Sequence, residues 1–108
     1  MAAVSVAIKF TKNDASRDFY SNSDIKNLVS SYISSGKILK QNTERSSDNL
    51  VETTTTVFEN QDTFQEFRSE EINKNNTKLR DLWCYENSIS YEITVDGVKV
   101  PNLQQTTR

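Results

Sequence analysis

The chain has 108 residues and a net charge of −2, with 34% hydrophobic and 26% charged residues, two Gly, one Pro, one Cys and no His. A chain of this length is expected to form one small domain with a modest core. The lack of histidine removes the commonest zinc and haem ligand and the usual general base near neutral pH, so histidine-dependent chemistry is excluded.

The thirteen basic and fifteen acidic residues are interspersed, so we expect no surface that follows a nucleic-acid backbone. Cys84 is the single cysteine, and the N-terminal residues lack the pattern of a secretory signal. No apolar run approaches the roughly 18 residues that a membrane span needs. The sequence therefore predicts a cytoplasmic protein without membrane or nucleic-acid partners.

Three elements are expected in the first third of the chain. Strict alternation of apolar and polar residues predicts a strand at residues 4–11, and a polar loop follows at residues 12–23. Apolar residues then recur at helical spacing over residues 25–33, which predicts an amphipathic helix. Either Asn22 or Ser23 is placed to cap its first turn.

The middle of the chain predicts a β-hairpin followed by helix. Strands at residues 38–45 and 50–59 are joined by a short polar turn, so they should pair antiparallel. Residues 62–86 predict either one bent helix or a short helix followed by a longer one, with Thr63 and Glu66 as a capping box. The apolar residues at broadly helical spacing, expected to face the core, are Phe64, Phe67, Ile72, Leu79, Leu82 and Trp83.

The last element is a strand at residues 89–95, where apolar and polar residues alternate again. The Asp96-Gly97 pair predicts a reversal, and residues 98–100 could add a short return strand. We accordingly divide the chain into a domain at residues 1–97 and a C-terminal extension or tail at residues 98–108.

This order of elements predicts the fold class. Strand, helix, strand, strand, helix, strand is the ferredoxin-like βαββαβ arrangement, an α+β fold in which a four-stranded antiparallel sheet carries both helices on one face. The RNA-binding version needs aromatic, glycine and basic residues on its third strand, and residues 50–58 contain no glycine and no basic residue. The RNA-binding version is therefore disfavoured. The metal-carrying version needs paired cysteines, so it is excluded.

The segment at residues 57–67, VFENQDTFQEF, ends a hairpin strand in an aromatic residue, adds a polar cap and opens a helix with further aromatics. With the chain length and the order of elements, this pattern resembles the dimeric α/β-barrel superfamily of antibiotic-biosynthesis-monooxygenase-like (ABM-like) domains over residues 4–96. The resemblance implies a homodimer in which two sheets pair into a barrel, and a small apolar pocket between each sheet and its own helices.

Large aromatic side chains are the candidates for lining that pocket, because ligand sites are mostly hydrophobic with a few polar groups. The candidates are Tyr32, Phe64, Phe67, Trp83 and Tyr91. A plain core is the alternative, since large aromatics supply most of the buried surface in a small domain. Tyr32 and Tyr91 are the more informative pair, because a buried phenol needs a hydrogen-bond partner.

No catalytic residue can be assigned from the sequence. Cys84 has no histidine to activate it, so we expect an inert, packed thiol. Exposed strand or helix faces account for the other charged candidates, which are Glu44, Arg45, Glu52 and Arg68. Some oxygenases of the resembling family use Asn and Trp around an aromatic substrate, and this chain offers Asn13 and Trp83 as residues of those types.

Three functions are compatible with these patterns. The leading one is a small domain that needs no cofactor or metal and either binds an apolar small molecule or serves as an accessory or structural dimer. The alternative is a cofactor-independent monooxygenase or isomerase acting on an aromatic or polyketide-like substrate. The third is an interaction module that uses a strand edge or the tail from Val98.

The lining of the pocket should separate the first two functions. An enzyme should place a polar or ionisable side chain in the cavity, from the set Asn13, Tyr32, Glu52, Arg68 and Tyr91. A simple binder should show only apolar lining or no cavity.

Overall fold

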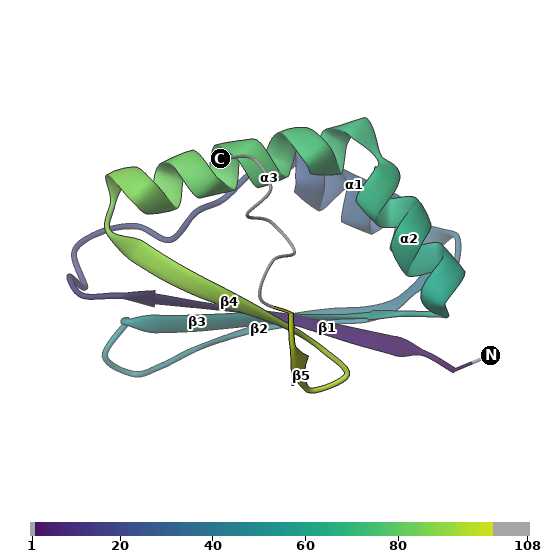
Figure 1. Ribbon diagram of the computed structural model, residues 1–108, viewed down its shortest axis with the longest axis horizontal. Coiled ribbons are helices and arrows are strands. Elements are labelled where there is room, and N and C mark those ends of the chain that lie inside the picture. Colours follow the sequence, from purple (N-terminus) through teal and green to yellow (C-terminus); the bar gives the residue numbers. More distant parts are fainter. Residues whose placement is uncertain (1, 101–108) are drawn as a thin grey trace.

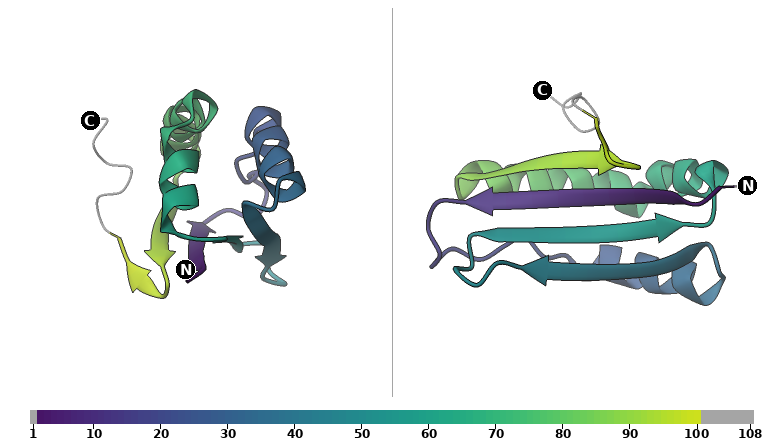
Figure 2. Two further views of the ribbon diagram at one scale, coloured as in Figure 1. Left: turned by 90° about the vertical axis from the view of Figure 1, so that its right-hand side faces the viewer. Right: turned by 90° about the horizontal axis from the view of Figure 1, so that it is seen from below.

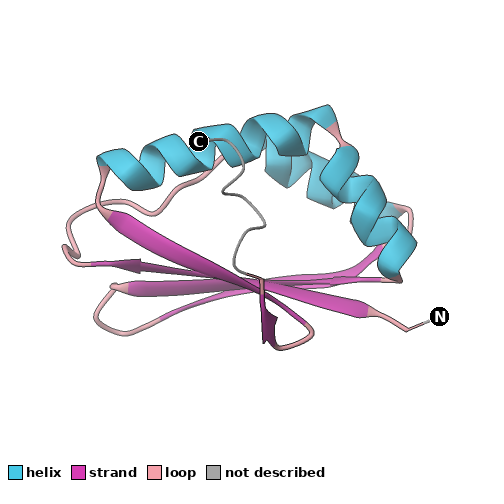
Figure 3. Cartoon of the chain, in the orientation of Figure 1, coloured by secondary structure: helices cyan, strands magenta, loops and turns pink. Residues whose placement is uncertain are grey.

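Five strands and three helices make up residues 2–100, the residues that the computed structural model describes (Figure 1). The elements are β1 (Val4–Lys12), α1 (Ser23–Ser34), β2 (Ile38–Arg45), β3 (Val51–Phe58), α2 (Gln61–Ser69), α3 (Glu71–Glu86), β4 (Ile89–Val95) and β5 (Val98–Lys99). The fold is therefore α+β, and Figure 3 shows the helices gathered on one side of the strands.

The strands form one antiparallel sheet in the order β2-β3-β1-β4-β5 (Figure 2). The expectation of four strands is corrected to five, because β5 pairs with β4 across the turn at Asp96-Gly97. Both turn residues have positive φ, 52° and 84°, and Asp and Gly tolerate that region better than most residues. The predicted hairpin of residues 38–45 and 50–59 is confirmed as β2 and β3.

The helical segment after β3 consists of a short helix and a longer one, which is one of the two forms predicted. Glu70 separates α2 from α3 with an extended backbone, φ −63° and ψ 135°. The predicted capping box is wrong, because α2 begins earlier: Asn60 is its N-cap and accepts a hydrogen bond from the Thr63 backbone N–H at 2.9 Å. Thr63 lies inside the first turn, where its hydroxyl contacts Glu59 at 3.2 Å.

α1 begins at a capping residue that the sequence indicated. The Asn22 side chain accepts hydrogen bonds from the backbone N–H groups of Asp24 and Ile25 at 2.8 and 3.2 Å. The Asn22 Nδ2 group also donates to the Tyr20 hydroxyl at 2.8 Å. Asn22 therefore fixes both the start of α1 and the position of the preceding loop.

Replacing Asn22 by alanine is expected to lower the free energy of unfolding by about 1 kcal/mol, the usual loss for a capping side chain. Ser23, the other capping candidate, is the matched control, and Ser23→Ala should change stability by less than about 0.5 kcal/mol. Urea unfolding of both variants measures the difference. Equal losses would show that the cap does not depend on Asn22.

The core lies between the inner face of the sheet and the helices. Ile38 and Phe58, paired across β2 and β3, are 1% and 2% exposed. The inner residues of β1, including Val4, Val6 and Phe10, are also buried, as the alternation predicted. Within residues 2–100 no helix has the length and apolarity needed to cross a membrane.

α3 turns a different face toward the sheet from the one that its apolar residues predicted. Ile72, Leu79 and Leu82 are exposed at 43%, 42% and 54%. The buried residues of α3 are Asn76, Arg80 and Cys84, spaced four residues apart along one stripe of the helix. The stripe of α3 that is turned inward thus contains two polar residues, Asn76 and Arg80.

Candidate functional site

A cavity of about 810 Å³ lies between the helices and the inner face of the sheet. Its lining comes from β1, β2 and β3, from all three helices, and from the loop that contains Phe19 to Asn22. In Figure 2, α1 stands beside the α2–α3 pair on the same face of the sheet. The cavity volume falls within the ~300–1,000 Å³ range typical of small-molecule sites.

One side of the cavity is apolar. Val6 and Ile8 contribute from β1, Phe58 from β3, and Phe64 and Phe67 from α2. The Phe58 ring lies 5.2 Å from Phe64 and 5.3 Å from Phe67, centroid to centroid, in tilted arrangements. These contacts join α2 to the sheet and give the cavity a rigid aromatic wall.

The side formed by β2 and β3 is polar, because the inward residues of these strands are mostly hydroxyl and amide side chains. Thr54 and Thr56 of β3 face inward beside Thr43 and Gln41 of β2. The Thr43 and Thr54 hydroxyls lie 2.9 Å apart, and the Gln41 Nε2 group donates to the Thr56 hydroxyl at 2.8 Å. A ligand against this wall meets groups that both donate and accept hydrogen bonds.

A carboxylate lies on the same wall, and its burial corrects the expectation that Glu52 is exposed. Glu52 is 7% exposed and lines the cavity. Its Oε2 accepts a hydrogen bond from the Arg45 Nε at 2.7 Å, and the two side chains also form an ion pair. The reason is register: Glu52 lies opposite the buried Phe10 of β1, so its side chain points to the inner face.

A hydrogen-bonded cluster joins the loop before α1 to α3 at the cavity wall. The Tyr20 hydroxyl donates to the Asn76 side-chain oxygen at 2.8 Å and accepts from Asn22. Burial raises the pKa of Tyr20 above its usual value, and the hydrogen bond from Asn22 partly opposes that rise. Tyr20 therefore stays neutral and holds Asn76 in place.

The five aromatic candidates do not gather in one place. Phe64 and Phe67 line the cavity, whereas Tyr32, Trp83 and Tyr91 lie outside its lining. Trp83 is 36% exposed, and its indole N–H donates to the Asp18 carbonyl at 3.1 Å. Tyr91 is half-buried and donates to Asp81, and burial followed by that contact raises its pKa to about 12.

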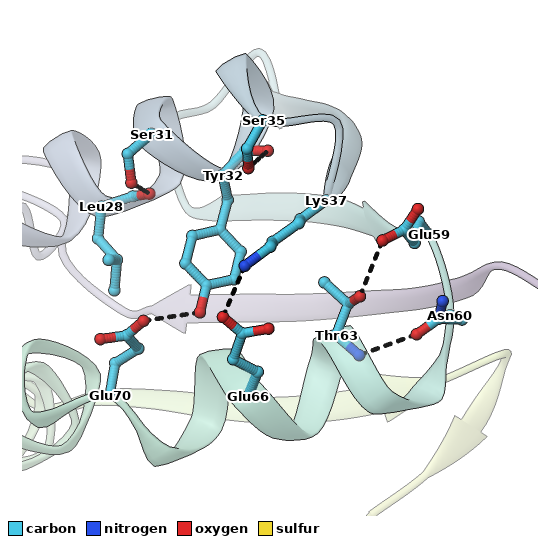
Figure 4. Close-up of polar contacts among 10 residues, drawn as sticks. All are labelled: Leu28, Ser31, Tyr32, Ser35, Lys37, Glu59, Asn60, Thr63, Glu66 and Glu70. Atoms are coloured by element: carbon cyan, nitrogen blue, oxygen red, sulfur yellow. Dashed lines mark hydrogen bonds and ion pairs between the residues drawn. The ribbon is translucent and has the colours of Figure 1, made fainter.

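Tyr32 links α1 to the junction of α2 and α3 (Figure 4). Its hydroxyl donates to the Glu70 carboxylate at 2.7 Å, and burial followed by this contact raises its pKa. Beside it, the Lys37 ammonium contacts Glu66 at 2.8 Å. The first pair holds α1 against the end of α2, and the second ties the connection between α1 and β2 to α2, so both stabilise the walls of the cavity from outside.

Of the polar groups proposed to distinguish an enzyme from a simple binder, Glu52 and Arg68 line the cavity. Asn13 is exposed in the loop after β1, and Tyr32 and Tyr91 lie outside the lining. Arg68 is half-buried, with its guanidinium carbon 5.8 Å from the centroid of the Phe64 ring. The lining is therefore mixed: it contains charged as well as apolar side chains, but neither Tyr32 nor Tyr91.

Asn76 and Arg80 are lining residues that were not predicted from the sequence. The available signal was their four-residue spacing, which puts them with Cys84 on one helix face. Two polar residues on a face usually mark the solvent side, and only the structure shows that this face is turned inward. Among residues 2–100, no three His, Cys, Asp or Glu side chains are grouped so that they could hold a metal ion.

Cys84 is buried on the inner stripe of α3, and burial raises the pKa of its thiol to about 11. Because the thiolate is the reactive form, alkylation by iodoacetamide near neutral pH should be at least about 100-fold slower in the folded protein than in the chain unfolded in urea. The rate of adduct formation, followed by mass spectrometry, measures this. Equal rates would contradict the packed, inert thiol.

Comparison with known proteins adds a likeness of fold. No protein-family model and no curated protein matches the chain. A conserved Bacteroides thetaiotaomicron protein of unknown function, described as a possible oxidoreductase, has a TM-score of 0.60 at 10% identity, covering 91% of this chain and 97% of its own. For Rv0793 from Mycobacterium tuberculosis the TM-score is 0.47 at 14% identity, over 87% of this chain and 92% of its own. The Bacteroides likeness shows a shared fold, and at such low identity it carries nothing about activity.

Proposed function

We propose that this protein binds a small molecule with an apolar body and polar groups in the cavity between the sheet and the helices, without a cofactor. The observation that carries the proposal is the cavity itself, with aromatic rings on one side and hydroxyl, amide and carboxylate groups on the other. Such a lining buries an apolar ligand and orients it through a few hydrogen bonds.

Two neighbouring threonines of β3 provide a matched test. Thr56 lines the cavity, whereas Thr55 points to the opposite face of the sheet, and both are half-buried. Thr56→Phe should therefore fill part of the cavity, and Thr55→Phe should leave it open. The probe is anilinonaphthalene sulfonate, whose fluorescence rises in an apolar site.

The wild-type protein and Thr55→Phe should enhance the fluorescence of this probe to the same extent, and Thr56→Phe should enhance it less. Circular dichroism in the far and near ultraviolet checks that both variants keep the native fold, so that the comparison is between folded proteins. Equal enhancement by all three proteins would mean that the probe binds elsewhere, which would contradict the proposal.

The second candidate is an enzyme of the cofactor-independent monooxygenase or isomerase kind, and the burial of Glu52 in the cavity favours it. A carboxylate in the cavity lining can accept a proton from a bound phenol or ketone. Glu52→Gln keeps the shape of the side chain and removes the base. If the protein is a monooxygenase, it should speed oxygen consumption with a polycyclic phenol, and Glu52→Gln should not. Unchanged rates with the wild-type protein would remove this candidate for such substrates.

We further propose that the fold is the ferredoxin-like arrangement of the dimeric α/β-barrel superfamily, extended by β5. The order β2-β3-β1-β4, with every helix of residues 2–100 on one face, supports this. In a homodimer the open sheet face, which carries Ser5, Ala7 and Lys9 of β1, would meet a second copy. Sedimentation at micromolar concentration should then report a dimer, and a monomer would remove this part of the proposal.

A cytoplasmic, reducing setting is also part of the proposal, because the chain has one cysteine and Cys84 is buried.

Of the proposed tail at residues 98–108, Val98 and Lys99 pair with β4 as β5, and residues 101–108 lie outside the described residues.

A further inference from the structure

The charge of the cavity lining is opposite in sign to the charge of the chain. Two acidic side chains, Glu52 and Glu71, line the cavity. The basic residues of the lining are Lys26, Arg45, Arg68, Lys74, Lys78 and Arg80. The lining therefore carries an excess of positive charge, although the chain as a whole has a net charge of −2. This concentration of positive charge favours an anionic ligand.

Arg80 is the most buried of these basic groups. Its residue is 5% exposed, and its Nε and Nη2 atoms are enclosed and have no hydrogen-bond partner among residues 2–100. Buried polar groups in native proteins are nearly always hydrogen-bonded, and leaving one unpaired costs stability. A guanidinium at the cavity wall with two unpaired nitrogens therefore calls for a partner from outside the chain.

The neighbours of Arg80 compensate its charge without satisfying its hydrogen bonds. The nearest carboxylate oxygen, Asp81 Oδ1, lies 3.8 Å from Nε, which is too far for a hydrogen bond. That oxygen already accepts the hydroxyl of Tyr91. The Tyr91 ring lies under the guanidinium, 4.8 Å from its carbon, and contributes a cation–π contact.

The two unpaired nitrogens define the shape of the missing partner. Nε and Nη2 form one edge of the planar guanidinium, and their N–H groups point in the same direction. A carboxylate presents two oxygens in one plane and accepts both hydrogen bonds at once. Asn76, one turn earlier on the same buried stripe of α3, also lines the cavity.

We infer that the cavity receives an amphiphilic monocarboxylate, with its apolar body against Val6, Ile8 and Phe58 and its carboxylate on the Nε–Nη2 edge of Arg80, which must turn toward the cavity when the ligand binds because both atoms are enclosed. The inference rests on the proposed binding function and names the ligand class. The basic residues of the lining attract the anion, and Arg80 orients it. The aromatic wall of α2 then covers the apolar body.

Three probes that share one apolar chain test this by calorimetric titration of the full-length protein below the micelle concentration. Dodecanoate carries the carboxylate, dodecanol carries no charge, and dodecyl phosphate carries a different anion. Dodecanoate should bind at least about 10-fold more tightly than dodecanol, because two charge-assisted hydrogen bonds are made only by the anion. Dodecyl phosphate can also accept hydrogen bonds from both nitrogens, so its affinity relative to that of dodecanoate decides between the two anions.

Arg80→Met should weaken dodecanoate binding by at least about 30-fold and leave dodecanol binding within about threefold of the wild type. Arg80→Lys keeps the positive charge but cannot donate two parallel hydrogen bonds, so it should weaken dodecanoate binding to an intermediate extent. Dodecanoate binding by Arg80→Lys also tests the inference if Arg80→Met fails to fold. Lys9→Met is the control, since Lys9 is an exposed basic residue on the open face of the sheet and does not line the cavity. It should change binding by no more than about threefold.

The other outcomes are decisive as well. If dodecanol binds as tightly as dodecanoate and Thr56→Phe abolishes both, the cavity binds ligands but Arg80 does not select a carboxylate. If dodecyl phosphate binds most tightly, the site is for phosphate and the inference is wrong. If neither dodecanoate nor dodecanol binds, the inference fails, and the fluorescent probe with Thr56→Phe then shows whether the proposed binding function fails with it.

Discussion

Replacing Ile38 by alanine should lower the free energy of unfolding by about 2–5 kcal/mol, the range for removing a large aliphatic side chain from a core. Ile38 is 1% exposed and belongs to the cluster that includes Tyr32 and Phe58. It begins β2, and a register shift follows it before Lys40. The side chain therefore anchors an edge strand whose other residues are exposed.

Leu39 is the control for this prediction. It follows Ile38 in the same strand but is 57% exposed, so Leu39→Ala should cost less than about 1 kcal/mol. Urea unfolding measures both variants, and the slope of the unfolding free energy against urea concentration should equal that of the wild type. Similar losses for the two variants would contradict the burial pattern at the start of β2.

The protein should lose stability steeply above about pH 10. Burial raises the pKa values of Tyr20, Tyr32, Tyr91 and Cys84 in the folded state. A raised pKa means that the unfolded chain ionises first, so stability is complete below the unfolded-state value and falls as the pH rises through the folded-state value. Each such group contributes a slope of up to about 1.4 kcal/mol per pH unit.

Tyr32→Phe isolates one of these contributions. The variant should cost about 1 kcal/mol near neutral pH, because the hydrogen bond to Glu70 is lost. Above about pH 10 its stability should fall less steeply than that of the wild type, by up to about 1.4 kcal/mol per pH unit. Thermal or urea unfolding across this pH range gives both slopes. Tyr85, which is 82% exposed, is the control, and Tyr85→Phe should keep the wild-type slope. A wild-type slope in Tyr32→Phe would contradict the raised pKa of Tyr32.

The strands were the most predictable part of this fold. In β1 one face is apolar and the other polar, so alternation identified both the strand and its inner face. A short polar turn fixed the pairing of β2 with β3. These signals are local, and they depend on few residues that lie close together in the chain.

The orientation of α3 was not predictable in the same way. Ile72, Leu79 and Leu82 form the apolar stripe that a surface helix normally buries, and in the structure they are exposed. Asn76 and Arg80 are buried instead, on a face of the helix that lines the cavity. A hydrophobic pattern predicts that a helix has an inner face, but a hollow beneath the helix changes which residues belong there.

Few of the residues that line the cavity could be predicted from the sequence. Phe64 and Phe67 lie in the lining, whereas Tyr32 and Tyr91 have hydrogen-bond partners within the protein, in Glu70 and Asp81. The role of these side chains in ligand binding stays a prediction. Glu52 was expected on an exposed face because charged residues usually lie there. Its burial depends on its register against β1, which a single strand does not reveal.

Binding of a ligand in the cavity between the sheet and the helices underlies both the proposed function and the role of Arg80. Titrating isotopically labelled protein with dodecanoate and following each backbone amide and the Arg80 Nε–H by nuclear magnetic resonance tests it directly. We expect the shifted signals to belong to lining residues such as Val6, Thr54 and Thr56 and to the Arg80 Nε–H. Shifts confined to the open sheet face, at Lys9 and Thr55, would contradict binding in the cavity, as would spectra that do not change.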